Sequence, residues 1–204
     1  MNKKFLFDLD STITSEEILP IIAAEIGKRD EMCFLTESTM MGEMSFDDSF
    51  IARIKILSSI PVSRARECVA NVRLNEKLVE FIKRNKEHCY IVTSNLDVWI
   101  DELIRRMGME GRVFCSHALV KGDRIDVVKR IIKKEESILN FNDAYVVAVG
   151  DGGNDYNFLK MADCGIGFGG VRRIAPRLLE VCDYAVYTED KLCELLEAIR
   201  GEYD

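Results

Sequence analysis

Short apolar runs alternate along the chain with segments in which apolar residues recur at helical spacing. The apolar runs cover residues 5–7, 89–92, 145–149 and 185–187, and the helical segments cover residues 96–107, 125–132 and 192–199. Continuous apolar runs of this length are typical of strands that are buried on both faces. Because strands that alternate with crossover helices form parallel sheets, the pattern predicts an α/β fold with a doubly wound, Rossmann-like parallel sheet.

Residues 15–73 interrupt this alternation with helical patterns alone. The isoleucines that recur at helical spacing before Gly27 are Ile18, Ile21, Ile22 and Ile26. Ser45 is a good N-cap for a second helix over residues 46–57, and Pro61 precedes a short third helix near residues 65–72. We therefore predict a small helical cap at residues 15–73, inserted after the first strand of a catalytic core made of residues 1–14 and 74–204.

Composition and charge narrow the class of protein. The net charge is −7, and the basic residues are mixed with acidic ones, which argues against a nucleic-acid partner. No apolar run approaches the length of a membrane span, and the apolar stretch near the N-terminus is too short for a signal peptide. The seven cysteines include no CxxC pair, which favours reduced, packed thiols over a disulfide or zinc framework. We expect a cytoplasmic protein that does not bind membranes.

Two carboxylates, Asp8 and Asp10, stand two residues apart directly after the first apolar run. In open α/β sheets, ligands bind beyond the carboxyl ends of the strands, so polar residues at that edge are candidates for chemistry. One carboxylate can act as a nucleophile while the other transfers protons, and a divalent cation would let the two lie close together. An Asx-turn or a helix cap explains one of the two aspartates, but not both.

Two further polar clusters follow apolar runs in the same way. Thr93 and Ser94 follow the run at 89–92, where hydroxyls and free N–H groups at a helix start can hold phosphate, although the same residues are also good helix caps. Asp151, Asn154 and Asp155 lie in a glycine-rich segment after the run at 145–149. Its two carboxylates can bind a hard cation through oxygen, although a simple turn has a similar composition.

The motifs at residues 7–12 and 150–155 together resemble those of the haloacid dehalogenase-like hydrolases, and within them the phosphoserine phosphatase-like branch. The resemblance implies that Asp8 is the nucleophile of an aspartyl-phosphate mechanism and that Asp10 is the general acid and base. It also implies that Mg²⁺ is bound by the Asp8 side chain, the Asp10 carbonyl and the Asp151 side chain, with support from Asp155. The remaining residues implied, as ligands of the phosphate oxygens, are Thr93, the Ser94 backbone and Asn154.

The family also carries a basic residue that pairs with the nucleophile and the phosphate. Arg124 fits the expected placement just before apolar residues that we assign to a helix, and Lys121 is the next candidate. Lys129 lies a little farther along the same segment. A solvated charge run near a helix start would account for at least two of these three residues.

The cap segment carries residues that resemble the substrate readers of phosphoserine phosphatases. Glu17 would bind the substrate ammonium and Arg53 its carboxylate, while Met40 and Phe46 would line the pocket. Taken singly, Glu17 also suits a helix start, and Phe46 and Met40 also suit a hydrophobic core. Two departures from close relatives are the Ser94–Asn95 pair, where Gly-Gly is usual, and a segment at 114–124 that we interpret as too short for their hairpin.

These observations predict a Mg²⁺-dependent phosphomonoesterase that acts on a small phosphate ester, with O-phosphoserine as the first candidate substrate. The alternatives are a phosphatase or phosphotransferase for another small phosphorylated metabolite, and a non-catalytic regulatory module that keeps the fold. The second alternative is disfavoured because Asp8, Asp10, Asp151 and Asp155 are all present. We expect a monomer or a homodimer.

Overall fold

Seven strands form one sheet in the order β4-β3-β2-β1-β5-β6-β7 in the computed structural model, which describes residues 2–40 and 43–201, Met40 by its backbone alone. The strands are β1 (Lys3–Phe7), β2 (Cys89–Leu96), β3 (Val113–Lys121), β4 (Arg124–Arg130), β5 (Tyr145–Gly150), β6 (Cys164–Phe168) and β7 (Tyr184–Val186). All neighbours are parallel except β3 and β4. The predicted doubly wound α/β sheet is confirmed, with one antiparallel edge strand.

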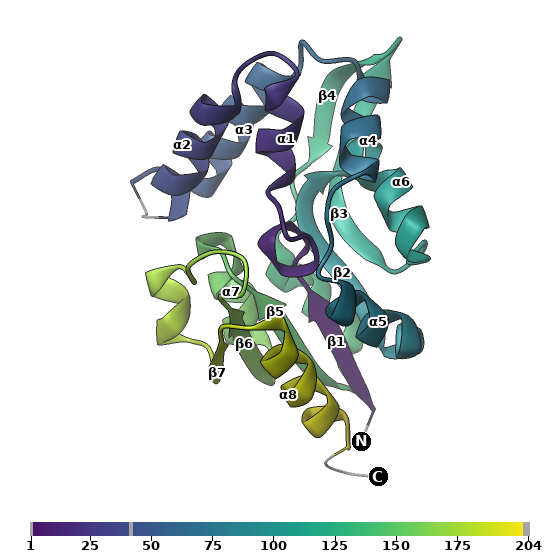
Figure 1. Cartoon of the computed structure of the whole chain (residues 1–204), viewed down its shortest axis with the longest axis vertical. Coiled ribbons are helices and arrows are strands. Elements are labelled where there is room, and N and C mark those ends of the chain that lie inside the picture. The colour runs from purple at the N-terminus through teal and green to yellow at the C-terminus, as the bar shows by residue number, and fades with distance from the viewer. Residues whose placement is uncertain (1, 41–42, 202–204) are drawn as a thin grey trace.

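Helices cover both faces of this sheet (Figure 1). The longer helices are α1 (Ile18–Ala24), α2 (Arg29–Met40), α3 (Phe46–Leu57), α4 (Val62–Ala70), α5 (Glu76–Arg84), α6 (Asp97–Met107), α7 (Tyr156–Met161) and α8 (Glu189–Gly201). The remaining helical turns, which are not α-helical, are η1 (Leu9–Ile13), η2 (Lys86–His88), η3 (Lys134–Phe141), η4 (Gly153–Asp155) and η5 (Pro176–Glu180). No helix in the described ranges is long and apolar enough to cross a bilayer.

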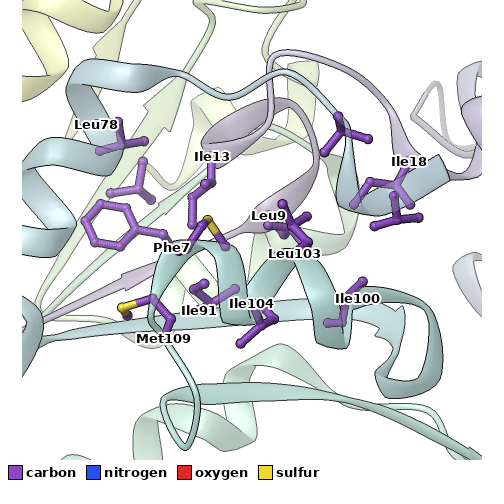
Figure 2. Packing of buried hydrophobic residues seen from close by; sticks show 14 of the residues in the cluster. Phe7, Leu9, Ile13, Ile18, Leu78, Ile91, Ile100, Leu103, Ile104 and Met109 are labelled. Atoms are coloured by element: carbon purple, nitrogen blue, oxygen red, sulfur yellow. The ribbon is translucent and has the colours of Figure 1, made fainter. Parts of the chain in front are cut away.

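Successive residues of the central strands are buried on opposite sides of the sheet. In β1, Phe5 and Phe7 join the larger hydrophobic cluster, whereas Leu6 joins a smaller one with Phe158 of α7. Side chains of a strand alternate between its two faces, so a strand covered on both sides needs apolar residues at every position. Figure 2 shows part of the larger cluster, to which Phe7 of β1 and Leu103 of α6 both belong.

The cap comprises α1 to α4, and the chain enters and leaves it at one place. Thr14 and Leu74 form an isolated antiparallel bridge, so the two connecting segments run side by side. The predicted boundaries of the cap, 14/15 and 73/74, lie next to this pair and stay a prediction. Helices α1, α2 and α3 pack together beyond the carboxyl edge of the sheet, whereas α4 packs against α6 of the core (Figure 1). Ser45 caps α3 as predicted, by accepting the N–H of Asp48 at 3.2 Å.

The helix predicted over residues 125–132 is wrong, because this segment forms β4 and pairs with β3. Only two residues, Gly122 and Asp123, separate the strands, and Gly122 has the positive φ of 63° that a tight hairpin requires. β-branched residues such as Ile125 and Val127 favour a strand once a partner is available. The segment before Arg124 is therefore long enough for a hairpin, contrary to our interpretation of its length. The sequence patterns also missed α2, α5, α7 and β6.

Candidate active site

Asp8 begins the site at the carboxyl end of β1. Its N–H donates to the carbonyl of Val149 in β5 at 2.8 Å, which extends the strand pairing by one residue beyond Phe7. The chain then makes one wide turn, η1, closed by the N–H of Thr14 on the carbonyl of Leu9 at 2.9 Å. Because strands β1 and β5 end at the same edge, Asp8 comes to lie beside the glycine-rich segment that follows β5.

A buried lysine, Lys134, joins two of the carboxylates at this edge. Its Nζ atom lies 2.5 Å from Oδ1 of Asp8 and 2.6 Å from Oδ1 of Asp155, and all three side chains are buried. Burial lowers the pKa of Lys134, but the charges of Asp155 and Asp8 outweigh burial and raise this pKa above its usual value. Lys134 is therefore a permanent cation next to Asp8, as required for a group that neutralises a phosphate approaching this carboxylate.

Three carboxylates could hold a metal ion at this edge. One oxygen each from Asp8, Asp151 and Asp155 can be chosen so that all three lie within 4.8 Å of one another. Burial, together with the neighbouring carboxylates, raises the pKa of Asp8, and burial raises the pKa of Asp151 to about 7. Oδ1 of Asp151 is buried and has no hydrogen-bond partner among the described residues. An unpaired buried oxygen within an all-oxygen donor set fits a hard divalent cation.

Asp155 is held by backbone groups of its own loop. Its Oδ2 accepts the N–H of Asp151 at 3.1 Å and that of Gly152 at 2.9 Å. Gly150 has no side chain for a structural reason, since a Cβ there would lie 2.6 Å from Oδ2 of Asp155. The glycines of this segment thus allow Asp155 to fold back over the end of β5.

Asp10 points away from the three-carboxylate group and toward the cap. Its Oδ1 accepts the N–H of Ile18, the first residue of α1, at 2.8 Å, and its Oδ2 accepts from Nδ2 of Asn95. Burial and the nearby charge of Glu17 raise the pKa of Asp10 to about 6. A carboxyl group with this pKa can donate and accept a proton near neutral pH, which suits the general acid and base role assigned to Asp10.

The cap closes over these groups and leaves a cavity of about 60 Å³. The residues that line the cavity from the cap side are Glu17, Leu19, Thr36, Thr39, Phe46, Phe50 and Arg53, and those from the core side are Asp8, Asp10, Ser94, Asn95, Lys134, Gly153, Asn154 and Arg172. Arg53 is buried, and its guanidinium lies 5.9 Å from the centre of the Phe46 ring. The predicted readers Glu17, Phe46 and Arg53 thus face the predicted nucleophile.

The expectation that Arg124 or Lys121 is the basic residue beside Asp8 is wrong. The two residues pair with each other across the β3–β4 hairpin, and both are exposed, as is Lys129. Lys134 takes this place instead, at the start of η3. The expectation failed because residues 125–132 were assigned to a helix. The sequence signal that could have identified Lys134 is weak, since it is one lysine in a charged run that follows Ile131 and Ile132.

The other predicted residues differ in where they lie. Ser94 and Asn154 line the cavity, whereas Thr93 is fully buried beneath it and its Oγ1 accepts the N–H of Asn95 at 3.2 Å. The side chain of Met40 lies outside the described part of the chain. The polar cavity-lining residues that are absent from the predicted site are Thr36, Thr39, Asn95, Lys134 and Arg172. Asn95 could have been noticed because it directly follows the predicted phosphate-binding pair.

The fold and the site together define a hydrolase with a doubly wound parallel sheet, in which aspartates at the carboxyl edge of the sheet face the helices of residues 15–73. Residues 5–160 match the model of the haloacid dehalogenase-like hydrolases, and the chain belongs to this family. The recognition made from the two aspartate motifs is confirmed. Members of this branch use a divalent metal, and the group formed by Asp8, Asp151 and Asp155 is suited to one.

Relatives in the phosphoserine phosphatase branch cover nearly all of the chain. A phosphoserine phosphatase of Methanocaldococcus jannaschii is 28% identical over 97% of this chain and 98% of its own length. One from Archaeoglobus fulgidus is 31% identical over 80% of this chain, which spans only about half (51%) of that protein. A solved structure of a phospho-aspartyl intermediate analogue of phosphoserine phosphatase has a TM-score of 0.80 and 26% identity, and covers 97% of this chain and 99% of its own.

Proposed function

We propose that this protein is a Mg²⁺-dependent phosphatase that hydrolyses O-phosphoserine to serine and phosphate through an aspartyl-phosphate on Asp8. The observation that carries the proposal is the position of Asp8, which contacts Lys134 and lies among further carboxylates at the floor of a cavity roofed by Glu17 and Arg53. The phosphoserine phosphatases similar to this chain support the choice of substrate.

Attack on a phosphate monoester requires that the repulsion between two anions be removed. Lys134 supplies one positive charge next to the attacking oxygen of Asp8. Asp8, the Asp10 carbonyl and Asp151, supported by Asp155, would hold Mg²⁺, which supplies further positive charge and polarises the phosphoryl oxygens when bound. Ser94 and Asn154 line the cavity at the same level and can donate hydrogen bonds to these oxygens.

Asp10 transfers the protons in both half-reactions. In the first, an Asp8 oxygen bonds to phosphorus, the phosphorus–oxygen bond to serine breaks, and the serine oxygen takes the proton of Asp10. In the second, water attacks the same phosphorus and gives a proton to Asp10, which releases phosphate and restores the Asp8 carboxylate. The pKa of about 6 allows Asp10 to serve both steps near neutral pH.

The cap side of the cavity offers charges of both signs for the amino acid. Glu17 is an anion for the ammonium, and Arg53 is a cation that can grip the carboxylate with two hydrogen bonds. Arg53 donates from Nε to the carbonyl of Ser49 at 3.3 Å and forms no ion pair within the described ranges. Its two terminal nitrogens therefore remain available to a ligand.

Phosphate release from a panel of phosphorylated metabolites tests the proposal. We expect O-phosphoserine to be among the best substrates and Asp8→Asn to abolish turnover of every ester. Glu17→Ala and Arg53→Ala should each lower kcat/KM for O-phosphoserine while sparing p-nitrophenyl phosphate, which carries neither an ammonium nor a carboxylate. Unchanged phosphoserine hydrolysis in both cap variants would overturn the substrate assignment, and activity that survives in Asp8→Asn would overturn the nucleophile.

A further inference from the structure

Arg172, in the loop between β6 and η5, reaches into the cavity and contacts residues of both the core and the cap. Its Nη1 pairs with Oε1 of Glu17, and its Nε pairs with Oδ2 of Asp151. Its side chain is 24% exposed, so most of the side chain is covered. An arginine guanidinium keeps its proton at every working pH. Arg172 is therefore a fixed cation in the substrate cavity.

Three charged side chains set the net charge that the cavity offers to the leaving group. Apart from the groups assigned to the phosphate and its protons, the charged residues that line the cavity are Glu17, Arg53 and Arg172. Two cations and one anion give one net positive charge. A serine leaving group carries one ammonium and one carboxylate, so its net charge is zero. The cavity thus has one more cation than serine requires.

Glu17 is already engaged by protein donors. Its Oε1 accepts from Oγ of Ser11 at 2.9 Å in addition to the ion pair with Arg172. An ammonium entering the cavity must therefore share Glu17 with a guanidinium that does not lose its charge. A divalent cation on Asp151 would weaken the contact of Arg172 with that carboxylate, and Glu17 would remain as its anionic partner. The attraction of the site for an ammonium is accordingly reduced, whereas its attraction for a carboxylate is increased.

We propose that Arg172 is a specificity-determining residue that extends the substrate class to phosphate esters of hydroxy acids, which carry a carboxylate and no amino group. The inference rests on the proposed function, since it uses the same nucleophile and the same cap. The bond changes are those given above: the phosphorus–oxygen bond to the hydroxy acid breaks, its oxygen takes the proton of Asp10, and water then releases phosphate from Asp8. Only the alcohol that leaves is different.

Three esters of graded charge test this assignment. The probes are O-phosphoserine, 3-phosphoglycerate and O-phosphoethanolamine, whose leaving groups carry net charges of about 0, −1 and +1 near neutral pH. In the wild-type enzyme, kcat/KM for 3-phosphoglycerate should lie within about tenfold of that for O-phosphoserine, and O-phosphoethanolamine should be much poorer. The neighbouring residue Arg173 is exposed and does not line the cavity, so Arg173→Gln is a matched control.

Variants of the ion pair should shift the preference in opposite directions. Arg172→Gln should lower the ratio of kcat/KM for 3-phosphoglycerate over O-phosphoserine by about tenfold or more, which is the loss expected for one charge-assisted hydrogen bond. Glu17→Gln should raise the same ratio, and Arg173→Gln should leave it unchanged. Calorimetric binding of both esters to the variants in an Asp8→Asn background separates recognition from chemistry. A purely structural role of Arg172 would weaken both esters equally.

The results distinguish this inference from the proposed function. A ratio that is unchanged in Arg172→Gln, or a wild-type enzyme that cleaves O-phosphoserine but not 3-phosphoglycerate, overturns the role of Arg172 and leaves the phosphoserine assignment intact. Cleavage of 3-phosphoglycerate without cleavage of O-phosphoserine overturns the phosphoserine assignment and supports the role of Arg172. Should Arg172→Gln fail to fold, Arg172→Met, which also removes the charge and keeps a side chain of similar length, decides by the same ratio.

Discussion

The Nζ atom of Lys134 lies 2.5 Å from Oδ1 of Asp8, although the two residues are 126 positions apart in the chain. Asp8 directly follows β1 in the middle of the sheet, whereas Lys134 begins η3 after the edge strand β4. The contact also includes Asp155, so one buried ammonium separates two buried carboxylates. Removal of the ammonium or of a carboxylate would leave an uncompensated charge in a buried site.

Replacement of Lys134 should therefore abolish most of the activity. We expect Lys134→Ala to lower kcat by about 100-fold or more, because the variant lacks the cation that neutralises the phosphate next to Asp8. Lys121→Ala and Arg124→Ala serve as controls, since both residues are exposed on the β3–β4 hairpin. Steady-state kinetics with circular dichroism of each variant makes the comparison. Wild-type kcat in a folded Lys134→Ala variant would refute the role of this lysine.

Asn95 should act through Asp10. Its Nδ2 donates to Oδ2 of Asp10 and to Oγ1 of Thr93, the latter at 3.1 Å, so it fixes the orientation of the acid. We expect Asn95→Ala to lower kcat for a poor leaving group such as serine by about tenfold or more, and to affect p-nitrophenyl phosphate much less, because nitrophenolate leaves without a proton. An equal loss with both esters would show that Asn95 does not act through proton transfer.

Stability should depend on pH and metal together. Burial raises the pKa of Asp10 from 3.8 to about 6 and that of Asp151 to about 7. Between about pH 3.8 and pH 7, these two carboxyl groups bind more protons in the metal-free folded protein than in the unfolded chain. The free energy of unfolding should therefore fall as the pH rises through this range. A divalent cation binds the ionised carboxylates, and the rise in Tm that it causes should therefore grow between about pH 5 and pH 8.

Thermal melts with Mg²⁺ and with a chelator, recorded across this pH range, measure both effects. In the difference in Tm between the two conditions, the contributions of titratable groups remote from the site cancel. Asp151→Asn is the control, in which the metal-dependent difference should nearly vanish. A difference that shrinks as the pH rises would contradict the assignment of the Asp8 and Asp151 carboxylates as metal ligands.

Gly150 should be required for the position of Asp155. A Cβ at residue 150 would meet both Cγ and Oδ2 of Asp155 at 2.6 Å, so Gly150→Ala must displace this carboxylate. We expect metal affinity to fall by about tenfold or more, as for other changes to groups that orient metal ligands. Gly201→Ala is the control, because no atom lies within 4 Å of its Cβ position. Titration calorimetry with Mg²⁺ would show equal affinities if the crowding had no effect on the site.

Much of the fold could be predicted because its central strands are buried on both faces. Such strands must be apolar at every position, and the acids that follow them, Asp8 and Asp151, then stand out. The edge strand β4 could not be predicted in this way. It is mostly exposed, its apolar residues also fit helical spacing, and its strand conformation depends on pairing with β3.

The site was predictable where its residues belong to compact motifs and not where single residues arrive from distant loops. Asp10 and Asn154 lie within motifs whose spacing is informative. Lys134 and Arg172 each stand beside another basic residue, and only tertiary structure decides which of the two turns inward. The charge of the cavity, and with it the preference among substrates, depends on exactly such residues.

The most direct test of the account is chemical trapping of the phosphorylated residue. Wild-type enzyme would be mixed with Mg²⁺ and O-phosphoserine, quenched, and treated with borohydride, which reduces an acyl phosphate to an alcohol. Peptide mass spectrometry would then locate the modified residue. The account predicts a reduced side chain at Asp8 that is absent without substrate and absent in Asp8→Asn. Reduction at a different carboxylate, or turnover with no trapped residue at Asp8, would contradict it.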